Sequence, residues 1–392
     1  MNLLDLIILV AAVAAGVGGY RLGFLARATS WIGLGVGLYV SARLLPTVVE
    51  LLGDGSGSTS RLLVAAIVLL GGAFLGQGLG LLAGLRLRTV LPPGPVRVAD
   101  RGVGAFLGVL GVVLVLWFLL PAMSQVKGSS ARLTRSSRVA GVIDEVLPRP
   151  PETWQSLRTL VGDVDFPQVF EGLYRAPETG PPPAASGLSA AVLDQVKAST
   201  VKVEGKACSR IQDGSGFVVA PNTVVTNAHV VAGEKTTEVI RPDRKRVKAT
   251  VTVFDSARDL AVLAVDGLGL NPLPIVGKSA EQGDVGAVLG HPGGQTPIAV
   301  APSKINRRVQ AVGRDLYDRR STTRDVFILA SRLAPGYSGG PLVNTTGEVT
   351  GVAFAIAPDR DGVAYALTDT ELREALATNK NTQQSTGPCV SG

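Results

Sequence analysis

One serine of this chain stands in a glycine-rich turn that suits a nucleophile. Ser338 lies in the sequence GYSGGP (336–341), whose glycines let the backbone turn sharply enough to direct N–H groups inward. A serine hydroxyl is a weak nucleophile at neutral pH and needs a neighbouring base to take its proton during attack. The backbone N–H groups of Gly336 and Ser338 could stabilise the oxyanion that this attack creates. The segment therefore predicts covalent catalysis at Ser338.

A histidine and an aspartate earlier in the chain complete a set that can perform this chemistry. His229 lies in the sequence TNAHV (226–230), and Asp259 opens the apolar stretch DLAVL (259–263). His229 can take the proton of Ser338 and return it to a leaving amine, while Asp259 fixes the imidazole tautomer and stabilises the imidazolium. Each motif alone is weak, but the three follow in the order His, Asp, Ser with gaps of 30 and 79 residues. Together they predict hydrolysis of peptide bonds through an acyl-enzyme.

Short strands must position these residues. Segments rich in Val and bounded by Gly, Pro and Asn recur after about residue 188 at the spacing of an all-β fold. They include 200–203, 216–219, 223–226, 248–253, 260–265 and 285–289. A terminal helix is expected near 369–377. The pattern predicts an all-β domain over 188–392.

At the three chemical residues the sequence resembles the trypsin-like serine proteases, over roughly residues 190–380. The sequences NAH (227–229) and DLAV (259–262) are most similar to the HtrA-type branch of that family. The resemblance implies a chymotrypsin-like double β-barrel and serine endopeptidase activity on protein or peptide substrates.

Two positions near the predicted site depart from the family pattern or leave alternatives open. Phe354 occupies a place where many relatives carry a hydroxyl that supports the buried acid, so Asp259 is expected to be less well hydrogen-bonded. Arg332 falls near the base of the predicted specificity pocket. If it points inward, it favours acidic P1 residues. If it points to solvent, Ala353 and Ala355 line the pocket and favour small or apolar P1 groups.

One histidine and two cysteines remain as candidate groups. His291 precedes the sequence PGG and is expected to be a loop residue rather than a second base. Cys208 and Cys389 are the two cysteines of the chain. An even count in an oxidising compartment indicates one disulfide, and two free thiols are the alternative. No cluster has the spacing of metal ligands, so neither a metal nor another cofactor is expected.

Four apolar segments precede residue 124, at Leu3–Tyr20, Ala28–Leu45, Leu62–Leu85 and Val103–Met123. A helix needs about 20 apolar residues to cross a hydrocarbon core of about 30 Å. The first segment is shorter and carries Asp5, but no Lys or Arg precedes it and three more segments follow. A retained helix is therefore favoured over a signal peptide. The sequence predicts an all-α four-helix transmembrane domain over 1–123, in contact with the lipid bilayer.

The placement of arginines predicts the orientation of this domain. The first predicted loop carries Arg21 and Arg27, and the third carries four arginines between 86 and 101. The positive-inside rule makes both loops cytoplasmic, so everything after Met123 is expected to be extracytoplasmic, in the periplasm. The first 126 residues hold eight of the 38 basic and four of the 31 acidic residues. Much of the net charge of +7 is thus explained by topology, and no nucleic-acid partner is expected.

Glycines recur every fourth residue on the third segment, at Gly72, Gly76, Gly80 and Gly84, and again at Gly104 and Gly108 on the fourth. Small residues at this spacing let helix backbones approach closely. The spacing fits internal packing of the helices, with a self-association surface or a small pore as the alternative. The region resembles the four-helix colicin V production protein family.

A connector is predicted over 124–187, because prolines at 148, 150, 151 and 181–183 interrupt a polar stretch. Within it, the apolar residues of 137–147 follow the spacing of a short amphipathic helix. This helix is expected either to lie on the membrane surface or to pack against the following domain.

The combination of a four-helix anchor, a proline-rich connector and a protease domain resembles the MarP-type family of actinobacterial membrane-anchored acid-resistance proteases, over nearly the whole chain. This resemblance implies cleavage of envelope proteins and a role in tolerating acid and oxidative stress. A scaffold that keeps a protease fold, or a transporter with an attached sensor domain, would be other classes of protein. The intact set of His229, Asp259 and Ser338 favours the protease.

Overall fold

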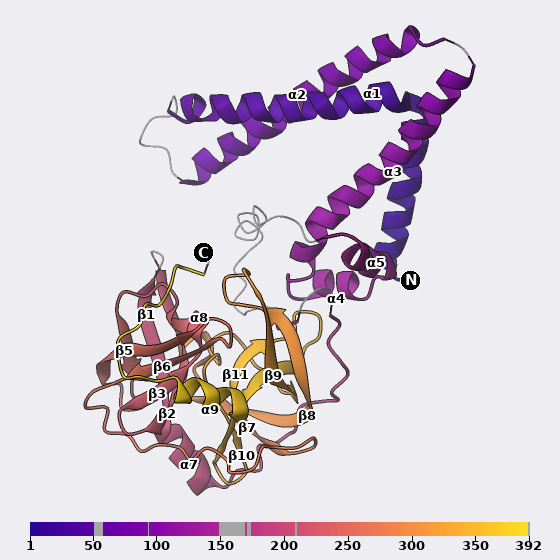
Figure 1. Cartoon of the computed structure of the whole chain (residues 1–392). Helices are drawn as coiled ribbons and strands as arrows, with labels where there is room; N and C mark the ends of the chain where they lie inside the picture. Colours follow the sequence, from indigo (N-terminus) through magenta and orange to yellow (C-terminus); the bar gives the residue numbers. More distant parts are fainter. Residues whose placement is uncertain are drawn as a thin grey trace. The chain divides into compact units, whose positions relative to one another are not determined.

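The chain divides into two compact units. The computed structural model (Figure 1) describes residues 1–50, 58–92, 94–148, 169–170, 174–207, 210–295 and 297–390. One unit comprises Met1–Leu119 with Ser137–Leu147, and the other Leu120–Ser136 with Pro148–Gly392. The predicted connector is thus shared: its residues up to Ser136 belong with the protease domain, and the next eleven, Ser137–Leu147, belong with the membrane helices. The prolines at 150 and 151 lie outside the described residues.

The first unit is helical, with α1 (Leu3–Glu50), α2 (Ser58–Thr89), most of α3 (Pro95–Met123) and α5 (Arg138–Val146). Within the described residues, three stretches are long and apolar enough to cross a membrane: Leu3–Leu45, Ile67–Thr89 and Pro95–Met123. The first has 43 residues, about twice the length that one crossing needs. Two separate spans were predicted here. The structure has one helix that is broken at Gly23, between the two predicted spans, where φ is 82° and ψ is 169°.

Two charged side chains from other helices satisfy the backbone at this break. A carboxylate oxygen of Asp100 on α3 accepts from the N–H of Leu25 at 3.0 Å, where the second half of α1 begins. The guanidinium of Arg88 on α2 donates to the carbonyl of Arg21 at 2.5 Å, where the first half ends. The two side chains also pair with each other at 3.1 Å. An anion at a helix N-terminus and a cation at a C-terminus both complement the helix dipole. A Cβ at Gly23 would lie 2.0 Å from Asp100, so only glycine fits.

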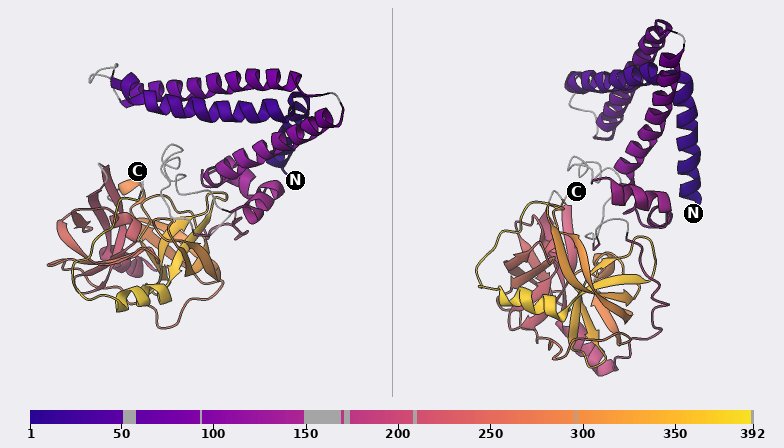
Figure 2. Two further views of the ribbon diagram at one scale, coloured as in Figure 1. Left: turned by 45° about the horizontal axis from the view of Figure 1, so that its top comes forward. Right: turned by 45° about the vertical axis from the view of Figure 1, so that its right-hand side comes forward.

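The glycines of the membrane unit serve internal packing. Helices α1 and α2 run side by side (Figure 2), and a Cβ at Gly33 would lie 2.1 Å from the carbonyl oxygen of Gly76. A Cβ at Gly37 would lie 2.0 Å from that of Gly72. Contacts this short leave no room for any side chain. Of the two interpretations of the glycine spacing, the structure agrees with close packing within the unit.

The short amphipathic helix α5 lies on α1. Ser137 caps its N-terminus by accepting from the N–H of Ala140 at 3.0 Å, and the same hydroxyl donates to Asp5 at 2.5 Å. Asp5 also accepts from the N–H of Val139 at 3.1 Å. The buried face consists of Ala140 and Ile143. The helix therefore packs with the membrane helices and is not part of the protease unit.

The second unit contains two closed six-stranded barrels, as the resemblance implied. The first has the order β1-β2-β3-β6-β5-β4, formed by β1 (Thr200–Ala207), β2 (Arg210–Ala220), β3 (Thr223–Thr226), β4 (Thr237–Ile240), β5 (Arg246–Asp255) and β6 (Leu260–Ala264). The second has the order β10-β11-β12-β9-β8-β7, formed by β7 (Val285–Gly290), β8 (Ala299–Arg314), β9 (Ser321–Ala330), β10 (Pro341–Asn344), β11 (Val349–Ile356) and β12 (Val363–Thr368). The remaining elements of the described residues are α4 (Ser129–Arg135), α7 (Ala190–Ser199), α8 (Ala228–Val231), η2 (Pro292–Gly294) and α9 (Asp369–Ala377).

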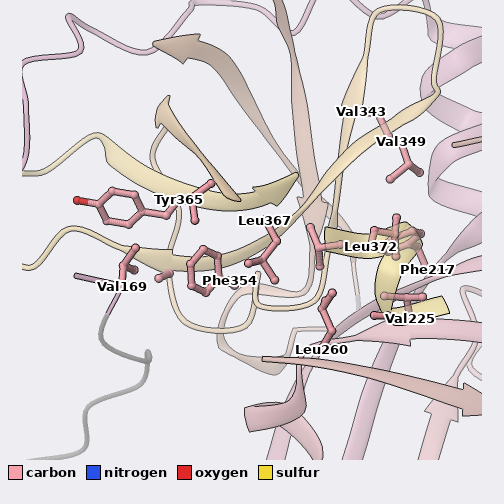
Figure 3. Packing of buried hydrophobic residues seen from close by; sticks show 14 of the residues in the cluster. Val169, Phe217, Val225, Leu260, Val343, Val349, Phe354, Tyr365, Leu367 and Leu372 are labelled. Carbon is pink, nitrogen blue, oxygen red and sulfur yellow. The ribbon is translucent and has the colours of Figure 1, made fainter. Parts of the chain in front are cut away.

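An apolar core joins the two barrels, and Figure 3 shows part of it. Phe217 and Leu260 enter it from the first barrel, Phe354 and Leu367 from the second, and Leu372 from α9. Helix α9 contacts strands of both barrels, namely β5 and β6 of the first and β9, β11 and β12 of the second. Burying side chains of this size contributes about 2 kcal/mol each. This core fixes the barrels against each other and thereby fixes the loops between them.

Candidate active site

His229 and Asp259 are held together by two hydrogen bonds. Nδ1 of His229 lies 2.7 Å from Oδ2 of Asp259, and the backbone N–H of His229 donates to Oδ1 at 2.8 Å. Asp259 is fully buried, whereas 13% of the His229 side chain is exposed. The amide of Asn227 donates to the carbonyl of Asp259 at 2.8 Å. Both carboxylate oxygens of Asp259 are thus hydrogen-bonded to His229. These two bonds fix the orientation of the imidazole ring and leave its Nε2 available for proton transfer.

Phe354, the residue that departs from the family pattern, is fully buried in the core between the barrels. Asp259 nevertheless has a partner on each oxygen, because the N–H of His229 supplies the second hydrogen bond. Among the described residues no hydroxyl donates to Asp259, as the sequence indicated, and both partners of its carboxylate belong to His229.

The turn that carries Asp259 is held by hydrogen bonds from the second barrel. Asp259 has a positive φ of 63°, which is strained for a residue with a side chain. The carbonyl of Ala257 accepts from Arg324 on β9 at 2.7 Å and from Thr322 at 3.2 Å. The N–H of Leu316, in the β8–β9 turn, donates to the carbonyl of Ser256 at 2.9 Å. These contacts hold the turn in its strained form.

Ser338 lies beside the turn that carries His229. A Cβ at the next residue, Gly339, would come within 2.4 Å of the Thr226 hydroxyl and 3.0 Å of the N–H of Asn227. The side chain of Ser338 is not hydrogen-bonded to the ring, and Nε2 of His229 has no hydrogen-bond partner among the described residues. Hydrogen bonds between catalytic groups are often loose without substrate and tighten when it binds. The structure therefore joins His229 and Asp259 and places the loop that carries Ser338 against the start of the His229 turn.

The predicted oxyanion donors are both available. In the described part of the chain neither Gly336 nor Ser338 donates its backbone N–H to an acceptor. Gly336 has a φ of 98°, and a Cβ there would lie 2.3 Å from the carbonyl oxygen of His291. Glycine is required at this position on both grounds.

The residues of the predicted specificity pocket differ in their exposure to solvent. Arg332 is exposed, while Ala353 and Ala355 are fully buried on β11. The carbonyl of Ala353 accepts from the N–H of Gly339 at 2.9 Å. This bond connects β11 to the loop that carries Ser338, residues 336–340, which we call the serine loop. The exposed arginine corresponds to the second of the two alternatives.

His291 is a buried loop residue and is not one of the three predicted catalytic residues His229, Asp259 and Ser338, which we call the triad. It is 3% exposed, Nδ1 lies 2.8 Å from the carbonyl of Gln295, and burial lowers the pKa of its ring. Its backbone N–H donates to the hydroxyl of Ser215 at 2.9 Å.

Of the two cysteines, Cys208 lies outside the described residues, so its bond to Cys389 stays a prediction. Cys389 packs on the backbone after α8, because a Cβ at Gly233 would lie 3.0 Å from its sulfur. The N–H of Gly233 donates to the carbonyl of Thr386 at 3.1 Å, and the Thr386 hydroxyl donates to the carbonyl of Glu234 at 2.9 Å. The C-terminal tail is therefore fixed directly behind the turn of His229. Over the described ranges no group of three or more His, Cys, Asp or Glu side chains could hold a metal ion.

Several residues that contact the candidate site were not predicted from the sequence. Ser215, Gln212 and Arg324 have no motif of their own, yet the amide of Gln212 donates to the carbonyl of His229 and Ser215 contacts the serine loop. The one signal was the glycine pair around Ser215 in the sequence GSG (214–216), which is typical of close backbone approach.

Comparison with known proteins relates both parts of the chain to known families. The trypsin-like peptidase domain family matches residues 214–352, and the colicin V production protein family matches residues 4–148. Serine protease Rv3671c of Mycobacterium tuberculosis is 32% identical over 403 residues, covering 99% of this chain and 98% of the relative. The crystal structure of the active form of the Rv3671c protease has a TM-score of 0.53 and 36% identity, over 57% of this chain and all of that one. Human serine protease HTRA4 is 31% identical over 48% of this chain and 40% of its own length.

The fold and the site together define a serine protease with a trypsin-like domain and a helical membrane domain. Because the similarity to Rv3671c extends over nearly both full lengths, the chain belongs to the MarP-type family of membrane-anchored serine proteases.

Proposed function

We propose that the chain is an extracytoplasmic endopeptidase that cleaves proteins of the cell envelope through an acyl-enzyme. The observation that carries the proposal is the pair of hydrogen bonds between His229 and Asp259, which leaves Nε2 of the ring free beside Ser338. His229 takes the proton of the Ser338 hydroxyl as this oxygen attacks the substrate carbonyl. The N–H groups of Gly336 and Ser338 stabilise the oxyanion, and His229 then protonates the leaving amine.

Asp259 stays ionised during this cycle and stabilises the transient imidazolium. Water then attacks the acyl-enzyme with His229 again as the base. The exposure of Arg332 supports a preference for small or apolar P1 groups. The resemblance to acid-resistance proteases supports a role in tolerating acid and oxidative stress, with four membrane spans and the protease domain outside the cytoplasm.

A fluorophosphonate probe tests the chemistry, because it reacts only with an activated serine. We expect the full-length protein in detergent micelles to be labelled, and Ser338→Ala to be unlabelled. His229→Ala should lower the hydrolysis of casein by several orders of magnitude, because the triad acts as a unit. Turnover close to wild type in purified Ser338→Ala would refute the assignment of the nucleophile.

A further inference from the structure

Ser215, on β2 of the first barrel, contacts the serine loop of the second barrel at two points. Its backbone N–H donates to the carbonyl of Ser338 at 2.8 Å. Its hydroxyl donates to the carbonyl of Gly336 at 2.6 Å. The side chain is fully buried. The two residues that it holds are those whose N–H groups are free for an oxyanion.

The other hydrogen bonds of Ser215 fix the direction of its hydroxyl. The N–H of His291 donates to Oγ at 2.9 Å, so that this oxygen is an acceptor on one side and a donor to Gly336 on the other. The hydroxyl of Thr226 donates to the carbonyl of Ser215 at 2.7 Å. Every polar atom of Ser215 therefore has a partner, and its geometry is rigid.

A second contact fixes the peptide unit before Gly336. The N–H of Gly293 donates to the carbonyl of Pro335 at 2.9 Å. Because the C=O and N–H of one trans peptide point to opposite sides, this bond sets the direction of the N–H of Gly336. The carbonyls on both sides of the Gly336 Cα are thus anchored, one by η2 and one by Ser215. Rotation of the peptide unit, which would turn the N–H away from the oxyanion, would break one or both bonds.

We propose that Ser215 is a positioning residue that holds the oxyanion donors of Gly336 and Ser338 in their productive direction. This inference rests on the proposed function of these two N–H groups. Ser215 does not touch substrate and acts through the loop. Preorganised donors are effective because they need no reorientation during the reaction, so a loosened loop should lower the rate of the chemical step more than substrate binding.

The test compares full-length Ser215→Ala with wild type in detergent micelles. The rate of fluorophosphonate labelling and the kcat for casein should each fall by about 10- to 100-fold, less than the roughly 10²- to 10³-fold loss of a complete donor. The KM should stay within about threefold. Amide hydrogens of residues 336–340 should exchange faster, while those of β5 and β6 should not. Ser215→Gly removes the same hydroxyl without adding an apolar atom and should reproduce the pattern.

Thr252→Val is the matched control, since it deletes a buried hydroxyl that also donates to a backbone carbonyl of the first barrel, at 3.2 Å to Val262. It should leave labelling, turnover and exchange of the loop unchanged. Labelling and kcat per titrated site within twofold of wild type in both Ser215 variants would overturn the proposal. Absence of labelling in wild type would instead refute the protease function, and the amide exchange would still show whether Ser215 holds the loop.

Discussion

At the scale of single residues, the first barrel buries a carboxyl group that takes no part in the chemistry. Glu234 follows α8, is 6% exposed, and packs on β1, where a Cβ at Gly205 would lie 2.1 Å from its carboxyl carbon. The hydroxyl of Thr237 donates to it at 2.5 Å, and its other oxygen has no hydrogen-bond partner among the described residues. Burial raises the pKa of Glu234 to about 7, helped by the charge of Glu204 and opposed by Thr237.

This shift predicts that Glu234 contributes more to the stability of the folded protease domain in acid than at neutral pH. The pKa of Glu234 is raised from an ordinary value of 4.5, so its contribution to stability is complete below pH 4.5 and is lost as pH rises to about 7. The loss is about 1.4 kcal/mol per pH unit in that range. Glu234→Gln should abolish this part of the pH dependence, measured as the temperature that halves fluorophosphonate labelling after incubation at pH 5, 6 and 7.

The control for this prediction is Glu281→Gln. Glu281 is exposed on the surface, and its hydrogen bond with Lys278 lowers its pKa, so it does not titrate in this range. Identical pH dependence in wild type and Glu234→Gln would mean that Glu234 is charged throughout.

The candidate residues His229, Asp259 and Ser338 could be singled out in the sequence because the proposed chemistry restricts the residue type as well as the order. Ser215 and Arg324 could not, since their importance lies in where the fold puts their polar atoms. Many side chains can donate to a carbonyl, and no local pattern records that the carbonyl belongs to Gly336 or Ala257. The second partner of Asp259 could not be predicted for a similar reason, because it is a backbone N–H, which every sequence supplies.

At the scale of elements, the β8–β9 hairpin is the support of the Asp259 turn. Arg324 is fully buried, and burial lowers the pKa of its guanidinium while the charge of Asp259 opposes that change. It donates to the carbonyl of Ala257 and also to that of Arg314 at 2.7 Å, within the hairpin itself. One side chain thus joins the hairpin to the strained turn.

We expect Arg324→Met to lower kcat by about 10- to 10³-fold, because a loosened turn lets Asp259 leave the ring of His229; complete disabling of the acid costs about 10⁴-fold. The free energy of unfolding should be affected less than kcat. An apolar side chain can often replace a buried charge without lowering the stability of the fold. Thr322→Val removes the longer bond to the same carbonyl and should have a smaller effect. Steady-state kinetics with casein would measure both. Equal kcat in Arg324→Met and wild type would exclude this role.

The break in α1 is a second element whose position, but not whose form, was predictable. Hydropathy and the arginines at 21 and 27 located a boundary between two apolar segments. That the boundary is a capped break within one helix depends on Arg88 and Asp100, which lie far along the chain. A pattern within one segment cannot contain that information.

Asp100→Ala should destabilise the membrane unit by about 1–2 kcal/mol, because it removes the cap of the N–H of Leu25 and leaves Arg88 unpaired. Asp100→Asn keeps an acceptor for that N–H and should lose less. Unfolding of the full-length protein in mixed micelles with increasing dodecyl sulfate would measure the order. Variants as stable as wild type would show that the cap is dispensable.

At the scale of the whole molecule, the chain places a soluble fold after membrane helices within one polypeptide. Both halves could be recognised from the sequence because hydropathy and strand spacing are properties of many residues, so single exceptions do not hide them. The division between them was less visible, since Ser136 and Ser137 belong to different units although they are neighbours.

The predicted compartment of the protease domain can be tested with reporters. The arginines at 86, 88, 97 and 101 predict that alkaline phosphatase fused at Arg97 is inactive and that a fusion after Pro181 is active. The reverse reporter pattern would place the protease domain in the cytoplasm.

In the same oxidising compartment Cys208 and Cys389 should be bonded, so alkylation of the unfolded, unreduced protein should find no free thiol. Two alkylated cysteines would exclude the bond.

The break at Gly23 also sets an order of events while the chain is being synthesised. Arg88 is made 67 residues after the carbonyl that it caps at Arg21, and Asp100 is made 75 residues after Leu25. Until both have been synthesised, neither side chain can cap the backbone groups at the break. Helix α1 therefore reaches its capped form only after the first residues of α3 have been made.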